Sequence, residues 1–393
     1  MKSLSEAEWI RRPGLKQLVD ALGADECRYV GGCVRDALVG HEANDIDLAT
    51  RHHPDRVVVM LDEAGIRTVP TGLEHGTLTA VLDSGPVEVT TLRRDVETDG
   101  RRATVEFSDA WEDDAARRDF TINALYAHPE TLEIFDYFGG LDDLAAHRVR
   151  FIGDARQRIR EDHLRILRYF RFQTRFGSDP LDREAVEACA ELAPMLKGLS
   201  RERVGWELQN LLALPDPSKT VALMADLGVL KVVLPETGGV QVHKLGTLIK
   251  AEREAGVEPD PIRRLVALLP PDPLVAEQVA ARLRLSNAQK KRIKEDTARQ
   301  DADCDDPRAL AYRLGKEVAC DRLLLCDAPI DRLKDWDVPR LPVKGGEIVA
   351  AGVAAGPEVA RVLRKIETRW IEEGFPDEVR TRVILAEEIA ALA

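Results

Sequence analysis

Several features are scarce in this chain of 393 residues, and each scarcity argues against a class of protein. It has only six cysteines, none in a Cys-x-x-Cys pair or another metal-ligand spacing. This pattern fits reduced thiols rather than a disulfide scaffold or a zinc site. No run approaches the roughly 18 apolar residues that a membrane-spanning helix needs, and the N-terminal segment lacks the apolar stretch of a signal peptide. We therefore expect a cytoplasmic protein that does not cross a membrane.

Positive charge is also in deficit. The chain has 56 Lys and Arg against 69 Asp and Glu, a net charge of −13. This balance argues against indiscriminate nucleic-acid binding but is compatible with a local basic groove. Apolar residues make up 44% of the chain, enough for substantial cores, and the length predicts two to three domains.

The most informative segment is 31–47, which reads GGCVRDALVGHEANDID. Asp45 and Asp47 are spaced to share one face of a strand, with Ile46 pointing into the core. Two neighbouring carboxylates repel each other unless a cation lies between them, as in Mg²⁺ sites that align a phosphoryl transfer. The glycine pair exposes backbone N–H groups to a phosphate. An ordinary loop explains either feature alone, but together they indicate nucleotidyl transfer.

A second cluster begins at Arg117-Arg118, where we expect the start of a helix within residues 113–126. An arginine guanidinium can bind two phosphate oxygens at once, and a helix N-terminus adds exposed N–H groups. This pattern therefore predicts a triphosphate site. A solvated helix start capped by Asp114 or Asp119 explains the same residues about equally well.

A third cluster is an arginine-rich helix. Residues 148–177 hold nine arginines, three acids and no lysine. Asp162, Arg165, Arg168 and Arg171 recur every three residues along it. The ordinary explanation is a solvated face, but the exclusive use of arginine favours planar recognition of phosphates or bases. Because Asp accepts a hydrogen bond from an exocyclic amine and Arg donates to ring acceptors, an Asp–Arg pair can read the pairing edge of a nucleotide without a template strand.

The order of predicted elements divides the chain into a mixed head and a helical remainder. In residues 1–140 we expect helices at 5–22, 34–39, 54–63 and 113–126, and strands at 27–30, 46–49, 76–82 and 87–92. The polar segment 93–108 is expected to be a mobile loop. Beyond residue 140 the expected helices are 154–176, 182–191, 201–212 and 217–227, followed by amphipathic segments separated by proline-rich breaks.

Taken together, these stretches resemble the class II tRNA nucleotidyltransferase and poly(A) polymerase family, within the DNA polymerase beta-like nucleotidyltransferase superfamily. The matching motifs are GGCVRDALVG with DIDLAT (31–50), VEVTTLRRD (87–95), RRDFTINALY (117–126), FDYFGGLDDL (135–144), EDHLRILRYFRF (161–172) and RERVGWELQNLL (201–212). They stand in the family's order and spacing and cover residues 25–215. The resemblance implies an α+β fold: a polymerase-beta-like head with a small mixed sheet, followed by an all-helical body and tail.

The resemblance also implies roles for the residues of the first two clusters. Asp45 and Asp47 would bind Mg²⁺ as catalytic carboxylates. Glu88 would be the third active-site carboxylate, either completing the metal site or helping to activate the RNA 3′-hydroxyl. Contacts to the triphosphate are implied for Gly32, Arg35 and Arg118.

For the third cluster, the resemblance implies nucleotide selection. Asp162 and Arg165 would act as an amino-acid template that selects CTP or ATP, and Arg168 and Arg171 would support the nucleotide site. The segment Arg94–Phe107 matches the flexible element tied to the switch from C to A addition. Glu202, Arg203 and Glu207 would lie on a structural helix that supports the helix carrying the nucleotide-recognising residues.

The implied function is Mg²⁺-dependent, template-independent addition of CCA to the 3′ end of tRNA from CTP and ATP. The expected domains are a catalytic head (1–140), a nucleotide-recognition neck (141–215) and a body and tail (216–393) that binds tRNA. The tRNA would be recognised through its 3′ end and its acceptor and T arms, by shape and backbone. The sequence does not indicate an oligomeric state.

Other functions remain open at this point. An A-adding, CC-adding or poly(A)-adding enzyme shares the motifs, although the long 93–108 segment argues against CC-only addition and the acidic tail against poly(A) synthesis. A catalytically silent RNA-binding homologue is disfavoured because all three carboxylates are present. A dinucleotide-dependent oxidoreductase is disfavoured because no ribose-binding acid pattern follows the glycines. His163 stands where many relatives have proline, and the absence of histidine after His243 argues against a phosphohydrolase tail.

Overall fold

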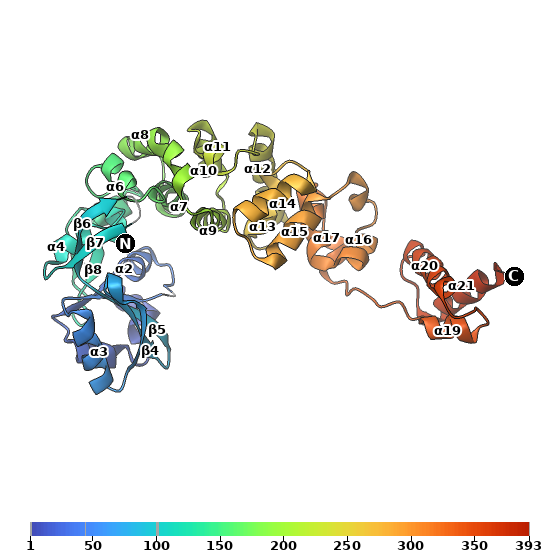
Figure 1. Cartoon of the computed structure of the whole chain (residues 1–393), viewed down its shortest axis with the longest axis horizontal. Coiled ribbons are helices and arrows are strands. Elements are labelled where there is room, and N and C mark those ends of the chain that lie inside the picture. Colours follow the sequence, from blue (N-terminus) through green and yellow to red (C-terminus); the bar gives the residue numbers. More distant parts are fainter. Residues whose placement is uncertain (1, 44, 100–101, 393) are drawn as a thin grey trace. The chain divides into compact units, whose positions relative to one another are not determined.

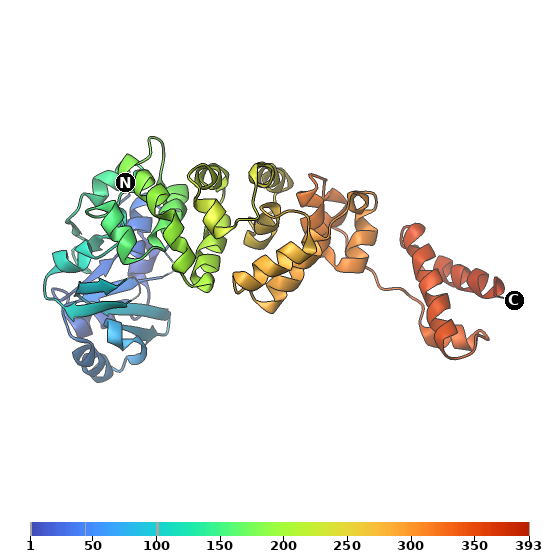
Figure 2. The same cartoon turned by 45° about the horizontal axis from the view of Figure 1, so that its top comes forward.

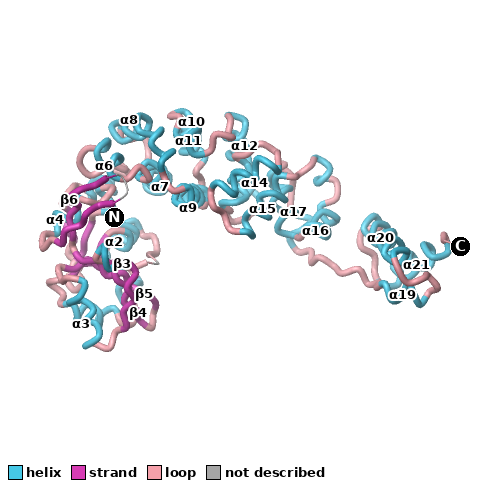
Figure 3. Tube along the Cα trace, in the orientation of Figure 1, coloured by secondary structure: helices cyan, strands magenta, loops and turns pink. Residues whose placement is uncertain are grey.

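In the computed structural model the described residues are 2–43, 45–99 and 102–392, with the backbone alone described for 95–99 and 102–105. The chain packs into two compact units, Met1–Pro235 and Glu236–Ala393. Within the described residues every strand lies in the first unit, and the second is built from helices (Figure 3). This distribution confirms the predicted α+β class with a sheet-containing head and a helical body. The finer division at residues 140 and 215 stays a prediction.

The head is organised around a seven-stranded mixed sheet. In spatial order its strands are β3 (Arg67–Gly72), β4 (Thr77–Leu82), β5 (Gly85–Thr91), β2 (Asp47–Thr50), β1 (Cys27–Val30), β8 (Leu125–Ala127) and β9 (Ile134–Asp136). Only the β2–β5 pair is parallel; the other neighbours in the sheet run antiparallel. The four predicted strands are confirmed with ends within two residues of the prediction, whereas β3, β8 and β9 were not predicted.

The parallel pair determines where the acidic residues lie. On β5, Val87 and Val89 are each 1% exposed, so Glu88 between them points to the opposite face. The register places Asp47, at the start of β2, directly beside Glu88. Ile46, just before β2, is buried as expected.

Helices cover the sheet of the head: α1 (Leu15–Leu22), α2 (Gly32–Val39), α3 (Pro54–Glu63), α4 (Trp111–Ala116) and α5 (Gly140–Ala145). Helix α3 begins with proline in its first turn, where the missing N–H group has no helical partner in any case. The helix expected over 5–22, with an interruption near Pro13-Gly14, is two 3-10 helices, Leu4–Glu6 and Glu8–Arg11, followed by α1. The predicted interruption is confirmed, and Gly14 adopts φ +83° there.

The rest of the first unit is helical (Figures 1 and 2, green). It comprises α6 (Ala155–Glu161), α7 (Arg165–Phe176), α8 (Arg183–Leu192), the 3-10 helix Ala193–Gly198, α9 (Arg201–Leu212), α10 (Ser218–Asp226) and α11 (Val229–Val233). Helix α7 buries Ile166, Leu167, Tyr169 and Phe170. Its arginines therefore lie along the remaining face, which the site uses.

Helices of the second unit begin with a repeated signal, Asp followed by Pro. The carboxylates of Asp260, Asp272 and Asp306 each accept hydrogen bonds from two backbone N–H groups of the helix that follows. The cap satisfies donors that have no helical partner, and proline suits the first helical position. The unit comprises α12 (Gly239–Ala255), α13 (Pro261–Ala267), α14 (Pro273–Arg282), α15 (Asn287–Thr297), the 3-10 helix Asp301–Cys304, α16 (Pro307–Leu314), α17 (Lys316–Leu325), α18 (Asp331–Lys334), α19 (Gly345–Ala350), α20 (Pro357–Glu372) and α21 (Glu378–Ala390).

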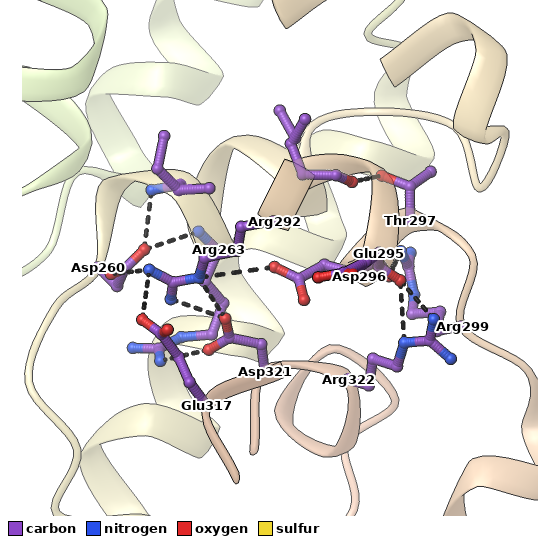
Figure 4. A network of polar contacts seen from close by, with 12 residues as sticks. Asp260, Arg263, Arg292, Glu295, Asp296, Thr297, Arg299, Glu317, Asp321 and Arg322 are labelled. Carbon is purple, nitrogen blue, oxygen red and sulfur yellow. Dashed lines mark hydrogen bonds and ion pairs between the residues drawn. The ribbon is translucent and has the colours of Figure 1, made fainter. Parts of the chain in front are cut away.

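A buried polar network joins α13, α15 and α17 (Figure 4). The Asp321 carboxylate accepts hydrogen bonds from Arg263 Nη1 at 3.0 Å and from Arg292 Nε at 2.7 Å. Asp296 is 0% exposed. When Asp296 and Asp321 are both charged, neither carboxyl oxygen of Asp296 has a hydrogen-bond partner among the described groups. Burial and the neighbouring Asp321 carboxylate raise the pKa of Asp296 to about 9. The pKa of Asp321 is raised as well, so the proton that bridges the two carboxylates belongs to the pair rather than to one residue.

The polar segment 93–108 is not the loop that its composition predicts. Its described residues form two paired antiparallel strands, β6 (Arg93–Asp99) and β7 (Arg102–Phe107). Hydrogen bonds between backbone groups hold such a ribbon together, so it forms without an alternating apolar pattern. The loop prediction was therefore wrong.

The predicted helix over 113–126 was also wrong. Helix α4 ends at Ala116, a 3-10 helix follows at Thr121–Asn123, and β8 begins at Leu125. Arg117 and Arg118 consequently lie at a helix C-terminus, not at an N-terminus. Their charge is favourable there, because the last carbonyl groups of a helix carry partial negative charge.

Candidate active site

One cleft of about 1290 Å³ in the first unit gathers the residues singled out in the sequence. Its lining includes Gly32, Arg35, Asp45, Asp47, Glu88, Arg118, Asp162, Arg165, Arg168 and Arg171. These residues come from α2, the segment just before β2, β2, β5, the turn after α4, the C-cap of α6 and α7. Asp162 is that C-cap, so the helix expected over 154–176 is interrupted between α6 and α7. The fold therefore brings all ten predicted residues together, although their individual roles stay predictions.

The carboxylates form one wall of the cleft. Asp47 and Glu88 are register partners on the parallel strands, and Asp45 precedes β2 by two residues. Burial is the main reason why the pKa of Asp47 rises to about 6; Glu88 and Asp45 raise it further, and Arg118 opposes the rise. The charged form of Asp47 is thus disfavoured chiefly by its burial.

This wall has the oxygen ligands that a hard divalent cation prefers. Within the described part of the chain, no three or more Asp, Glu, His or Cys side chains converge closely enough to hold a metal by themselves. Mg²⁺ commonly binds through one or two carboxylates and completes its shell with water and substrate phosphates. The observed arrangement of Asp45 and Asp47 fits that mode.

The glycine pair leaves room for an arginine. Gly31 has φ +72°, and a Cβ there would lie 3.4 Å from Nη1 of Arg118. A side chain would therefore be strained by the backbone and would press on the guanidinium. Gly32 opens α2, so its N–H faces the cleft end of that helix.

Arg35 is held in place by the protein itself. It is 6% exposed, its Nε donates to Asp36 at 2.8 Å, and a second N–H group donates to the side-chain oxygen of Asn123. Its guanidinium also lies 4.3 Å from the ring centroid of Phe176. Asp36 in turn receives Arg175 at 3.0 Å. This cation is preorganised at the floor of the cleft.

Asp114 orients the second arginine cluster. Its carboxylate, 1% exposed, accepts Arg117 Nε at 2.8 Å, Arg118 Nη2 at 3.0 Å and the hydroxyl of Tyr126 at 2.6 Å. Burial alone would raise its pKa, but Arg118 and Arg117 hold the pKa of Asp114 at about 2. The predicted phosphate-binding arginine is thus fixed by a buried anion rather than by a helix N-terminus.

Asp162 and Arg165 both line the cleft but do not pair with each other. Asp162 accepts Arg203 Nη2 at 2.7 Å and the backbone N–H of Leu164 at 3.1 Å. Arg165 donates from Nη1 to the carbonyl of Arg158 at 2.9 Å and to Glu161 at 2.7 Å. Its Nη2 donates a third hydrogen bond, to the Arg117 carbonyl at 3.2 Å. These three bonds engage three of the five N–H groups of the guanidinium. Both groups are therefore positioned with hydrogen-bonding capacity left over.

Arg168 and Arg171 are anchored by acids from other elements. Arg171 Nε donates to Glu207 on α9 at 2.7 Å, and Arg168 Nε donates to Asp119 at 2.7 Å. Glu207 is 1% exposed, and removing it would leave the half-buried guanidinium of Arg171 without its acidic partner. The supporting role expected of α9 is visible in these contacts.

Sequence reasoning misassigned one residue behind the cleft and missed two in its lining. Asp114 was predicted only as a helix cap, although its spacing of three and four residues before Arg117 and Arg118 is the signal of helical ion pairs. Asn123 and Trp206 line the cleft. Both stand within the matched motifs 117–126 and 201–212, but no role was predicted for them, because their positions at the cleft depend on tertiary packing.

Two family models match the chain. The "Poly A polymerase head domain" matches residues 27–150, and the "Probable RNA and SrmB- binding site of polymerase A" matches residues 180–238. The first range contains the carboxylates and the first two arginine clusters. The second contains α9.

Curated relatives share most of the chain. The chain is 36% identical over 389 residues to the mitochondrial CCA tRNA nucleotidyltransferase 1 of Mus musculus, covering 92% of this chain and 87% of the relative. The human protein of the same name is 34% identical over 385 residues, with the same coverage. The CCA-adding enzyme of Streptococcus sanguinis is 40% identical over 216 residues, 54% of this chain and 52% of that protein.

Solved structures share the fold. The Bacillus stearothermophilus CCA-adding enzyme in complex with CTP superposes with a TM-score of 0.76 at 24% identity, covering 96% of this chain and 98% of that one. The Thermotoga maritima CCA-adding enzyme complexed with tRNA-CCA gives 0.74 at 22% identity, covering 99% and 98%. Across the described residues, no helix has the length and apolar character needed to cross a membrane.

Proposed function

The chain belongs to the CCA tRNA nucleotidyltransferase family, and we propose that it adds C, C and A to the 3′ end of tRNA from CTP and ATP, without a nucleic-acid template. Each step is a nucleotidyl transfer that releases pyrophosphate. The observation that carries the proposal is the single cleft with carboxylates on one wall and positioned arginines with Asp162 on the other. Such a cleft has groups for the reacting phosphate and for the base of one nucleotide.

We propose Mg²⁺ as the cofactor, held by Asp45 and Asp47. The adjacent positions of Asp45, Asp47 and Glu88 support a cation there, because positive charge would offset the burial of Asp47 and the repulsion from its neighbours. Bound Mg²⁺ would supply Lewis acidity that lowers the pKa of the RNA 3′-hydroxyl and neutralises the leaving pyrophosphate. Glu88, beside Asp47, either completes the metal site or accepts the hydroxyl proton.

The triphosphate would be bound by the arginines of the head. Arg118 is aimed by Asp114 and has space because Gly31 carries no side chain. Arg35 and the N–H group of Gly32 add positive potential at the same end of the cleft. Preorganised donors of this kind stabilise developing charge without reorganising during the reaction.

Base selection is assigned to Asp162 and Arg165. The carboxylate accepts from an exocyclic amine, which both cytosine and adenine present, and the guanidinium donates to ring acceptors. Arg168 and Arg171 support this wall through Asp119 and Glu207. On this proposal residues 1–140 hold the chemistry and residues 141–215 read the nucleotide.

Residues 216–393 are proposed to bind tRNA. In the tail, a groove of about 490 Å³ along α20 is lined by four basic residues (Arg361, Arg364, Lys365 and Arg369) together with Thr368, Glu372 and Glu388. Arg361 and Arg369 are paired with glutamates, which leaves Arg364 and Lys365 as the stronger candidates for phosphate contacts. Because the protein is acidic overall, it needs local clusters of basic residues to bind RNA phosphates.

The proposed location is the cytoplasm. The six cysteines are free thiols, and Cys27, Cys33 and Cys189 are buried, which suits a reducing compartment. The animal relatives are mitochondrial by name. Detection of the protein in fractionated cells tests the location.

The direct test of the site is the double variant Asp45→Asn with Asp47→Asn. We expect it to abolish CTP and ATP incorporation into tRNA lacking its CCA end, while the protein stays folded. The matched control is Asp55→Asn with Asp83→Asn, which removes the same charge at exposed positions outside the cleft. Full activity in the first double variant would show that the metal assignment is wrong.

A further inference from the structure

Trp206 on α9 is the one exposed aromatic side chain among the residues whose burial is described. It is 59% exposed and lines the cleft. The other four tryptophans are buried or half-buried. Trp206 makes no ring–ring or cation–π contact with the other described residues, in contrast to the rings of Phe172 and Phe176. The packing of the first unit therefore does not use its indole.

The helix itself explains why the ring faces the cleft. Helix α9 buries Val204, Leu208 and Leu211 on one side. Residues three and four apart share a helix face, so Trp206 lies beside Glu202 and Arg203, which also line the cleft. Arg203 donates a hydrogen bond at 2.7 Å to Asp162, the residue proposed to recognise the edge of the base.

A nucleobase presents two kinds of surface, a polar edge and a π face. Asp162 and Arg165 supply partners for the edge but no platform for the face. The other aromatic ring in the lining, that of Phe172, is 5% exposed and already lies under the guanidinium of Arg171, 4.8 Å from its centroid. Trp206 is the remaining platform, and stacking on such a ring is how proteins bind unpaired bases.

The position of Trp206 along the depth of the cleft indicates which base would stack on its indole. The proposed triphosphate site is deep, with Arg35 6% exposed, whereas Trp206 stands with exposed Glu202 and Arg203 at the rim. An RNA end must enter over such a rim to reach the carboxylates. Resting on the proposed function, we propose that Trp206 stacks on the unpaired 3′-terminal base of the RNA substrate and positions its hydroxyl for attack.

The kinetic test compares Trp206→Ala and Trp206→Phe with the wild type. Loss of a base–aromatic stack corresponds to a weakening of about 5- to 150-fold. We expect Trp206→Ala to raise KM for tRNA within that range, Trp206→Phe to retain most of the affinity, and KM for CTP and ATP to stay unchanged in both. Met195→Ala is the matched control, because Met195 is also an exposed apolar residue of the first unit but lies outside the cleft lining.

The spectroscopic test uses the fluorescence difference between the wild type and Trp206→Phe, which reports on Trp206. We expect tRNA lacking its CCA end to quench this signal and the same tRNA ending in an abasic ribose to leave it unchanged. Quenching by CTP alone, equal quenching by the abasic RNA, or no quenching would overturn the inference. If the wild type adds CCA while Trp206→Ala keeps its KM for tRNA, the inference fails alone; if the wild type adds no nucleotide, the proposed function fails.

Discussion

Replacing Asp114 by asparagine tests how the buried anion organises the cleft. Asp114 joins Arg117, Arg118 and Tyr126 through three hydrogen bonds at 1% exposure. Asparagine keeps the shape of the side chain but removes its charge. We expect two losses: a less stable first unit and a phosphate-binding arginine that is no longer aimed.

The size of the first loss follows from the pKa of Asp114, which is held at about 2 against an ordinary value of 3.8. At about 1.4 kcal/mol per unit, this gap corresponds to about 2.5 kcal/mol of stability. Because the folded-state pKa is lowered, that contribution is present above the ordinary value and is lost as the pH falls toward about 2. We therefore expect Asp114→Asn to lower the free energy of unfolding by about 2.5 kcal/mol at pH 7.

The second loss is in nucleotide binding. A hydrogen bond to a charged group contributes about 1.5–3 kcal/mol, so KM for CTP and ATP should rise about 10- to 100-fold while KM for tRNA stays unchanged. Urea unfolding and steady-state kinetics measure the two effects. Glu112→Gln, an exposed residue of the same helix, is the control for charge alone. An Asp114→Asn protein with the urea midpoint and CTP affinity of the wild type would refute this reasoning.

Three further outcomes are expected. Arg165→Ala should reduce the preference between CTP and ATP, measured as the ratio of their kcat/KM values, more than it weakens triphosphate binding; an unchanged ratio would argue against base selection by this residue. Burial and Asp321 raise the pKa of Asp296 to about 9, so its stabilising contribution is complete below its ordinary value of 3.8 and declines as the pH rises toward 9. Between pH 6 and pH 9, thermal unfolding should therefore show Asp296→Asn losing less stability than the wild type, and parallel curves would contradict the shared proton. Arg364→Glu with Lys365→Glu should raise KM for tRNA and leave KM for CTP alone, whereas equal effects on both would count against a tRNA-binding tail.

Part of the carboxylate wall was predictable because its signals are local. Gly31 needs a backbone conformation that glycine adopts without strain, and the alternation around Glu88 places its side chain opposite Val87 and Val89. The register that sets Asp47 beside Glu88 joins two segments about forty residues apart. The spacing of Asp45 and Asp47 predicted their part of this wall, whereas Glu88 was identified only through the family resemblance.

The errors have physical causes in particular segments. The strand pair of β6 and β7 has few apolar residues, so the pattern that reveals half-buried strands is absent. In the stretch after α4, Phe120, Ile122 and Leu125 are all 0% exposed. A short run buried on every side has no single period, and it was read as helix although it contains a 3-10 turn and a strand.

Long-range ion pairs were beyond sequence reasoning. Glu207 meets Arg171 across 36 positions of sequence, and Arg203 meets Asp162 across 41. Which arginine each acid contacts depends on how α7 and α9 pack. The same packing exposes Trp206 on the cleft, which no local pattern announces.

The most direct measurement of the central claim is the sequence of the products that the wild-type chain makes. The protein is incubated with Mg²⁺, CTP and ATP and with tRNA ending before CCA, after the first C, or after the second C, and the 3′ ends are sequenced. The account predicts that all three substrates finish with a single CCA. Addition of A alone, addition of C alone, a long A tail, or no addition would contradict it.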